Sequence, residues 1–365
     1  MSWATRAELG ARVGSDPAPG SLLLGPVPGE GFVALEPEAR AALRERSAAT
    51  LAAAGLASGE RAVLSLNADA DLAAPLLADA LAALGVSAAV VGPRGRMRLL
   101  AALRALRPGV WITTPTGALD FLARLYLEFN VDPTELELRH ILLVGEIETP
   151  GTARRLADEF EARVTGLYCD PVFGMALAWG RDDQWQLTDP ASLGLAPLER
   201  DEWLAVAPGS PDAPLAELVL RPAWSGALAG TTLRTGQVVR GAPGASLFRH
   251  TVGPHVLVRG RWLSLPALRR ALGAIDGIAG LRVVLSRGER TLDLLRLQVA
   301  FGRAGLVENP MWARRVREAV AAITPVAFEL ETEAAVEGAA EQELVDERGH
   351  HLGLDRAEAA RSAGG

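Results

Sequence analysis

The chain has 365 residues, of which 49% are hydrophobic, and a formal net charge of −7. This length suffices to bury a sizeable core, normally in two domains, and the acidic balance argues against nucleic acid as a partner. All 37 positions occupied by lysine or arginine are arginine. Schiff-base chemistry and a P-loop lysine on phosphates are therefore excluded.

Apolar strands alternate with helices in the first half of the chain. The alternation follows a predicted helix over 36–54 and continues to residue 163. Strands separated by helices predict a doubly wound, mainly parallel sheet. The predicted strands, each with the helix that follows it, are 62–66 and 72–84, 86–91 and 94–106, 110–113 and 116–129, and 141–144 and 151–163.

The second half of the chain has a different pattern. Short strands with many turns over 171–250 predict a β-rich, barrel-like part, which would complete a large N-terminal domain over 1–250 whose α/β part spans 22–170. A small α+β domain is expected over 251–348. The alanine-rich, polar end over 349–365 predicts a disordered tail.

The composition also bears on where the protein resides. The most apolar stretch contains Pro75 and Asp79 and breaks at Gly85, so it predicts a helix and a buried strand, with no membrane span. The single cysteine, Cys169, excludes an internal disulfide. The start of the chain lacks the apolar core of a signal peptide. We therefore expect a cytoplasmic protein.

Three segments in the α/β half carry a family resemblance. They are Thr113-Thr-Pro-Thr-Gly-Ala-Leu119, Asn130-Val-Asp-Pro-Thr-Glu-Leu-Glu-Leu-Arg139 and Val144-Gly-Glu-Ile147. In this order and spacing the chain resembles the phenylacetate–CoA ligase branch of the adenylate-forming (AMP-binding) enzymes over about 22–348. The resemblance implies a large domain with α/β and barrel-like parts, a small mobile C-terminal domain, and the loss of a leading subdomain.

The resemblance assigns a pocket for the acyl group and the nucleotide. It places Thr114, Pro115 and Glu146 in this pocket, and the family's Arg-Gly loop matches Arg259 and Gly260. Many members of the family are dimers, so a homodimer stays open. The family's hinge arginine and aspartate have no counterpart over 250–254.

The family's phosphate-binding groups are altered. The stretch over 22–32 corresponds to its hydroxyl-rich phosphate loop but has no hydroxyl, contains Pro26 and Pro28, which lack backbone donors, and adds the negative charge of Glu30. Ala339 occupies the position of the family's catalytic lysine. We expect no competent phosphate site and, without that lysine, no catalytic residue of the ligase type.

The groups expected near adenine, ribose and magnesium are altered as well. Tyr168 matches a family tyrosine, but Pro171 replaces the glutamate that follows it, and only the neighbouring Asp170 remains as a metal ligand. Gln237 replaces the ribose-binding aspartate after Arg234, which removes a charge-assisted hydrogen bond. The resemblance therefore predicts a catalytically degenerate relative that forms no acyl-adenylate.

The predicted role is that of a binding or accessory protein for an acyl or aryl group, CoA, a carrier protein or an active ligase. The helix over 94–106 is basic, and it is either a solvated face or a contact for phosphopantetheine, CoA or an acidic carrier. Its region carries five arginines: Arg94, Arg96, Arg98, Arg104 and Arg107.

Two enzymatic alternatives stay open. The first is an active AMP-forming ligase that uses ATP, Mg²⁺ and CoA. It requires a nucleotide site built from Glu146, Asp170, Arg234 and Gln237. The second is an ATP-independent acyl transferase or thioesterase with Cys169 or Ser264 as nucleophile, in which His140 or His250 approaches the thiol.

Overall fold

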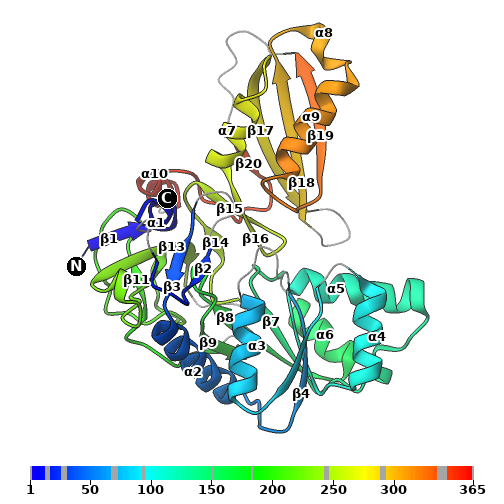
Figure 1. Cartoon of the computed structure of the whole chain (residues 1–365), viewed down its shortest axis with the longest axis vertical. Coiled ribbons are helices and arrows are strands. Elements are labelled where there is room, and N and C mark those ends of the chain that lie inside the picture. Colours follow the sequence, from blue (N-terminus) through cyan, green and yellow to red (C-terminus); the bar gives the residue numbers. More distant parts are fainter. Residues whose placement is uncertain are drawn as a thin grey trace.

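The computed structural model describes residues 2–12, 17–25, 31–66, 73–92, 95–149, 151–181, 184–241, 246–287, 293–334 and 343–363. An α/β unit and a β-sheet unit together form a large domain, and a small α+β domain stands at one end of it (Figure 1). Among the described helices, none has the length and apolar character needed to cross a membrane.

The α/β unit contains a seven-stranded sheet with the order β10-β9-β8-β7-β6-β4-β5. The strands from β4 to β8 are parallel, as predicted, and β9 and β10 extend one edge in antiparallel fashion. The strands are β4 (Arg61–Ser65), β5 (Ser87–Val90), β6 (Val110–Thr113), β7 (His140–Val144), β8 (Arg163–Cys169), β9 (Ala176–Arg181) and β10 (Gln184–Leu187).

Helices cover both faces of this sheet. Alternate strand residues supply the two cores: Trp111 packs with the helices of one face and Ile112 with those of the other. One face carries α4 (Arg96–Leu106), α5 (Pro115–Arg124) and α6 (Thr152–Phe160), and the other carries α2 (Pro37–Ala53) and α3 (Ala73–Ala83). The predicted doubly wound arrangement is confirmed. A π-helical turn (Leu125–Phe129) extends α5, and a 3-10 turn (Pro133–Leu136) precedes β7.

The predicted β-rich part is confirmed, and it is not a closed barrel, because the described strands of the second sheet form an open path. Its strands run in the order β1-β13-β12-β11, with β14 also beside β13, and β1 and β11 form the two ends of the path. The strands are β1 (Ser2–Thr5), β11 (Leu193–Ala196), β12 (Ala216–Leu220), β13 (Thr231–Val239) and β14 (His250–Thr251). A separate hairpin of β2 (Leu22–Leu24) and β3 (Val33–Leu35), helix α1 (Arg6–Arg12) and a 3-10 turn (Gly226–Leu228) complete this unit.

The small domain begins with a β-hairpin and continues as an α+β sandwich. The hairpin consists of β15 (His255–Val258) and β16 (Arg261–Ser264). A four-stranded sheet in the order β19-β18-β17-β20 follows, with two helices packed against it through an apolar core. The elements are α7 (Leu265–Gly273), β17 (Ile278–Arg287), β18 (Asp293–Phe301), α8 (Ala304–Val307), α9 (Pro310–Ala321), β19 (Phe328–Ala334) and β20 (Leu344–Asp346).

The predicted disordered tail is wrong for residues 349–363. After β20 the chain leaves the small domain and ends in helix α10 (Arg356–Ala363) beside α1 on the large domain (Figure 1). Ala359 is only 1% exposed, and Arg356 forms an ion pair with Glu217 of β12. This segment is ordered because it is buried and because it forms a long-range ion pair. The local composition indicates neither of these contacts.

Candidate functional site

The Thr-Pro turn and Glu146 come together at the carboxyl ends of two neighbouring parallel strands. Thr114 follows β6 and caps α5, where its Oγ1 accepts a hydrogen bond of 3.1 Å from the amide of Gly117. Glu146 follows β7, and Thr116 donates to its two carboxylate oxygens from the backbone N (2.8 Å) and from Oγ1 (2.6 Å). The first turn of α5 therefore holds the Glu146 side chain.

The hairpin of the small domain covers Glu146. Its turn residue Gly260 has a φ of +71°, and a Cβ there would lie 3.3 Å from Glu146 Cγ and 3.4 Å from Thr114 Cγ2. Arg259 also lies in this turn, and its Nε donates to the carbonyl oxygen of Asp293 at 2.6 Å. Glu146 is only 6% exposed, and burial raises its pKa to about 7, although the hydrogen bonds from Thr116 oppose the shift.

Tyr168 and Gln237 form a second, separate pair. The Tyr168 hydroxyl donates to Gln237 Oε1 at 2.8 Å, and both side chains are buried. Burial raises the pKa of the phenol well above its ordinary value, so it remains a donor. The amide oxygen at the family's ribose-binding position is thus already engaged by a side chain of the same site.

Asp170 supports its own turn. Its Oδ1 accepts from the amides of Val172 (3.0 Å) and Phe173 (2.7 Å), and its Oδ2 accepts from the amide of Met175 (2.8 Å). The Asp170 side chain is only 2% exposed, and this burial raises its pKa to about 6, although the hydrogen bonds from the backbone amides act to lower it. Both oxygens hold backbone N–H groups, and no cluster of three metal-ligating side chains occurs in the described part of the chain. The residues present do not fit a magnesium site.

Arg234 lies in a buried ion network on the open sheet. Its Nη1 donates to Glu217 Oε2 at 2.8 Å, and its Nη2 lies 3.0 Å from Asp201 Oδ1. The described contacts do not join Arg234 to Glu146, Asp170 or the Gln237 amide. Each of the four residues that the ligase alternative requires is therefore engaged by a different set of partners.

Cys169 lacks the setting of a nucleophile. Burial raises the pKa of its thiol far above the ordinary value. Neither histidine considered as its base is directed toward it: His140 shares a hydrogen bond of 2.9 Å with Thr165, and His250 shares one of 3.0 Å with the carbonyl oxygen of Gly349.

Ser264, the other candidate nucleophile, caps a helix. Its Oγ accepts a hydrogen bond of 3.0 Å from the amide of Ala267 at the start of α7, and the side chain is buried. This is the ordinary use of a serine that follows a strand and precedes a helix. The serine therefore stabilises the small domain, and its position does not suggest attack on a thioester.

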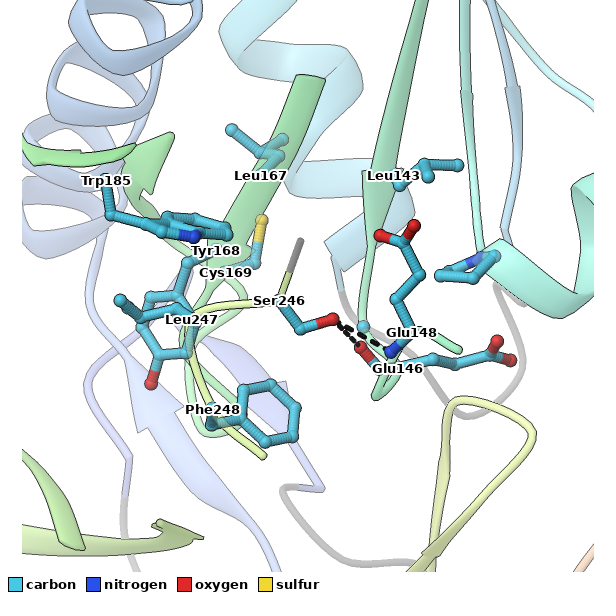
Figure 2. A pocket seen from close by; sticks show the side chains of 12 residues that line it. Leu143, Glu146, Glu148, Leu167, Tyr168, Cys169, Trp185, Ser246, Leu247 and Phe248 are labelled. Atoms are coloured by element: carbon cyan, nitrogen blue, oxygen red, sulfur yellow. Dashed lines mark hydrogen bonds between the residues drawn. The ribbon is translucent and has the colours of Figure 1, made fainter. Parts of the chain in front are cut away.

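Between Glu146 and Cys169 lies a cavity of only about 20 Å³. Figure 2 shows Ser246 beside the backbone that carries Glu146 and Glu148. The hydroxyl of Ser246 donates to the carbonyl oxygen of Glu146 (3.1 Å) and accepts from the amide of Glu148 (2.9 Å). A cavity of this size holds about one water molecule, so it excludes an acyl group in this arrangement. No sequence motif pointed to Ser246.

A second cavity lies between the domains and has a volume of about 350 Å³. Its polar wall includes Arg96 of α4, which donates to both carboxylate oxygens of Asp120 at 2.7 and 3.1 Å. The small domain contributes two arginines and an apolar edge. The lining residues are Ser65, Arg96, Leu99, Thr114, Thr116, Gly117, Asp120, Phe121, Arg259, Arg261, Pro325, Val326 and Ala327. The basic helix pointed to Arg96, but no pattern linked it to Asp120 or Arg261.

Three sets of predicted residues lie outside the described residues. They are Ala339, which the resemblance places at the family's lysine position, the central part of the altered phosphate loop, residues 26–30, and Arg94 of the basic region. The strands on either side of that loop form the β2–β3 hairpin.

No family model and no curated protein matches the chain. Solved structures do match it, at low sequence identity. The structure of 2-hydroxyisobutyryl-CoA ligase with 2-HIB-AMP and CoA in the thioesterification state has a TM-score of 0.75 and 14% identity, covering 94% of this chain and 76% of that chain. An open conformation of the same ligase gives a TM-score of 0.50, with 14% identity, over 87% of this chain and 73% of that chain.

A further similarity is to an amide bond synthetase, McbA, from Marinactinospora thermotolerans. It has a TM-score of 0.63 and 14% identity, over 88% of this chain and 66% of that chain. A malonyl-CoA ligase complex has a TM-score of 0.60 and 12% identity, over 88% of this chain and 71% of that chain. The chain therefore has the fold of the adenylate-forming CoA ligases.

Proposed function

We propose that this protein does not form acyl-adenylates and instead binds an acyl or aryl group carried on CoA or on the phosphopantetheine of a carrier protein. One observation carries the first part: the polar groups expected to hold a nucleotide are bonded to each other or to their own turns. Gln237 is held by Tyr168, and Asp170 is held by backbone amides. The cavity that Tyr168 lines has a volume of only about 20 Å³.

The inter-domain cavity supports the second part. Its volume of about 350 Å³ suits a ligand arm or a small acyl group. Arg96, Arg259 and Arg261 make its polar wall cationic, opposed by a single carboxylate, Asp120. Leu99 and other apolar residues form the remaining wall. A phosphate-bearing carrier with an apolar acyl group matches both walls.

Two assays test this function. The first is acid-dependent exchange between ATP and pyrophosphate over a panel of aryl and fatty acids, for which we expect no signal above background. The second is a thermal-shift screen with ATP, AMP, CoA, several acyl-CoAs and a phosphopantetheinylated carrier protein. A ligand that binds the folded protein raises the midpoint temperature of its thermal unfolding. We expect stabilisation by an acyl-CoA or by the loaded carrier and none by the nucleotides. Stabilisation by nucleotides alone would contradict the proposal.

A matched pair of variants locates the site. Arg96→Gln removes a cationic wall residue, whereas Arg104→Gln removes an exposed arginine of the same helix that does not line the cavity. Loss of a charge-assisted hydrogen bond to phosphate weakens binding by roughly 10-fold or more. We expect this loss for Arg96→Gln only, measured by titration of the stabilising ligand. Equal affinities for the two variants would place the ligand elsewhere.

The active-ligase alternative has one observation in its favour. The TM-score is higher against 2-hydroxyisobutyryl-CoA ligase in the thioesterification state, 0.75, than against its open conformation, 0.50. Such a ligase would need Arg234 and Gln237 to leave their present partners. Robust pyrophosphate exchange with any acid would establish this alternative.

A further inference from the structure

The chain passes between the two domains twice. It first leaves the large domain after β14, through residues 252–254, and enters the β15–β16 hairpin. It returns after β20, through residues 347–355, and ends as α10 on the large domain (Figure 1). A rotation of the small domain must therefore move two chain segments, not one.

The returning crossing is hydrogen-bonded to the end of β14 and to the outgoing crossing that follows it. The amide of Thr251 donates to the carbonyl oxygen of His350 at 2.7 Å, and the amide of Leu352 donates to the carbonyl oxygen of Thr251 at 2.9 Å. The amide of Gly253 donates to the carbonyl oxygen of Gly353 at 3.0 Å. The returning segment thus lies along the outgoing one, with an isolated parallel β-bridge between Thr251 and His351.

The outgoing crossing is also held on its other side. Thr251 is paired with Gln237 of β13, and the amide of Val252 donates to the carbonyl oxygen of Gly236 at 2.9 Å. Hinges move by changing the backbone dihedrals of a few connecting residues. Here the backbone N–H groups of Thr251, Val252 and Gly253 are all engaged, so such a change breaks several hydrogen bonds together.

Both ends of the returning segment are anchored, one in each domain. In the small domain, Arg348 donates to Asp293 Oδ2 at 2.6 Å and to the carbonyl oxygen of Leu257 at 3.1 Å. In the large domain, Arg356 donates from Nε (2.9 Å) and Nη2 (3.1 Å) to the two carboxylate oxygens of Glu217, which is 0% exposed.

Helix α10 adds apolar contacts to this second anchor. Ala359 is buried together with Leu198, Val238 and Val252, so one cluster joins the helix, the open sheet and the outgoing crossing. The Arg356 guanidinium also lies against this crossing, because a Cβ at Gly253 would lie 3.5 Å from its Nη2.

From these contacts we infer that residues 347–363 form a brace that holds the small domain in one orientation on the large domain. The brace keeps the two walls of the inter-domain cavity together, and Arg356 is its main anchor. The inference concerns domain orientation alone and does not depend on what the cavity binds.

Fluorescence energy transfer between the domains tests the brace. In a Cys169→Ser background, Arg154→Cys and Arg314→Cys provide labelling sites whose native side chains are 88% and 77% exposed. For the labelled chain without further substitutions, we expect one narrow distribution of energy-transfer efficiencies. Arg356→Ala should increase the fraction of molecules in other orientations by about 10-fold, as expected for losing a two-point charged contact. Arg356→Lys keeps the positive charge but cannot donate to both carboxylate oxygens in the same way. It should give an intermediate fraction of molecules in other orientations.

The control is Arg361→Ala, which removes an exposed arginine of the same helix and should leave the distribution unchanged. Circular dichroism and thermal unfolding verify that each variant is folded. A distribution for Arg356→Ala that superimposes on that of the native chain would overturn the brace.

Hydrogen exchange of the native chain provides a second test that needs no variant. The amides of Thr251, Val252, Gly253 and Leu352 should exchange as slowly as those in the centre of β13. Exchange of these four amides at the rate of the exposed loop over 199–203 would show that the crossing opens freely, and would also overturn the brace. This measurement decides the question if Arg356→Ala does not fold.

Discussion

Glu217 of β12 and Arg356 of α10 form a two-point ion pair across 139 residues of sequence. Glu217 also accepts from the amide of Gly236 at 2.7 Å and from Arg234, so its fully buried carboxylate is the centre of a network of charged groups. Removing one member of such a network leaves uncompensated charge and strands a buried donor.

We therefore expect Glu217→Ala to lower the free energy of unfolding by about 3 kcal/mol or more. The decrease is measured by chemical denaturation. Glu333→Ala is the control, because Glu333 lies exposed on β19, and such a surface change costs less than about 0.5 kcal/mol. Equal effects of the two substitutions would show that the buried network does not stabilise the protein.

Glu146 predicts a specific dependence of stability on pH. Burial raises its pKa from 4.5 to about 7, and the nearby Asp293 adds to the shift. A carboxyl with a raised pKa binds its proton more tightly in the folded state, so its contribution is complete below pH 4.5 and is lost as pH rises through 7. The native chain should therefore lose stability over this window.

Glu146→Gln isolates this contribution. The amide can keep both bonds, because its oxygen accepts from the Thr116 amide and its NH₂ group donates to the Thr116 hydroxyl. We expect the free energy of unfolding of this variant, relative to that of the native chain, to increase by up to about 3 kcal/mol between pH 4 and pH 8. Asp170 contributes in the same direction but is present in both proteins. A stability difference that stays constant across this range would contradict the raised pKa.

Local patterns predicted the parallel sheet because short, mainly apolar runs alternate with segments of helical length. The predicted strand over 110–113 coincides with β6 (Val110–Thr113), whose four residues are all buried. The Thr-Pro pair likewise marks the start of α5, since a hydroxyl cap followed by proline is a local signal.

What the sequence did not reveal depends on contacts between distant segments. The ordered end of the chain rests on the pairing of Arg356 with Glu217 and on one buried alanine, Ala359, in an otherwise polar segment. The same network engages Arg234, which the resemblance had assigned to the nucleotide pocket. An arginine in a strand has the same local pattern whether it binds a ligand or a buried carboxylate, so only the fold separates the two.

The thiol of Cys169 should be unreactive in the folded protein. Because burial raises its pKa, almost no thiolate is present at pH 8, and only the thiolate attacks disulfide reagents. We expect labelling by Ellman's reagent to be at least about 100-fold slower in the native protein than in urea. Labelling at equal rates would mean that the thiol is exposed and ionised, and would revive its role as an acyl acceptor.

Restoring the family's charged groups should not restore adenylation. Gln237→Asp returns the ribose-binding carboxylate and Ala339→Lys returns the catalytic lysine. The Tyr168 hydroxyl, however, lies 2.8 Å from the side-chain oxygen at position 237 and can donate to the new carboxylate as well. The neighbouring cavity of about 20 Å³ still admits only a water molecule.

We therefore expect the double variant to give acid-dependent pyrophosphate exchange at background, with an active acyl-CoA ligase assayed in parallel as the positive control. Adding Tyr168→Phe frees the carboxylate and leaves the size of the neighbouring cavity as the main obstacle. Exchange that appears only in this triple variant would identify the Tyr168 hydroxyl as the group that closes the site. Exchange that is absent from the native chain but present in the double variant would contradict this expectation and would show that the missing charges matter more than the size of the pocket.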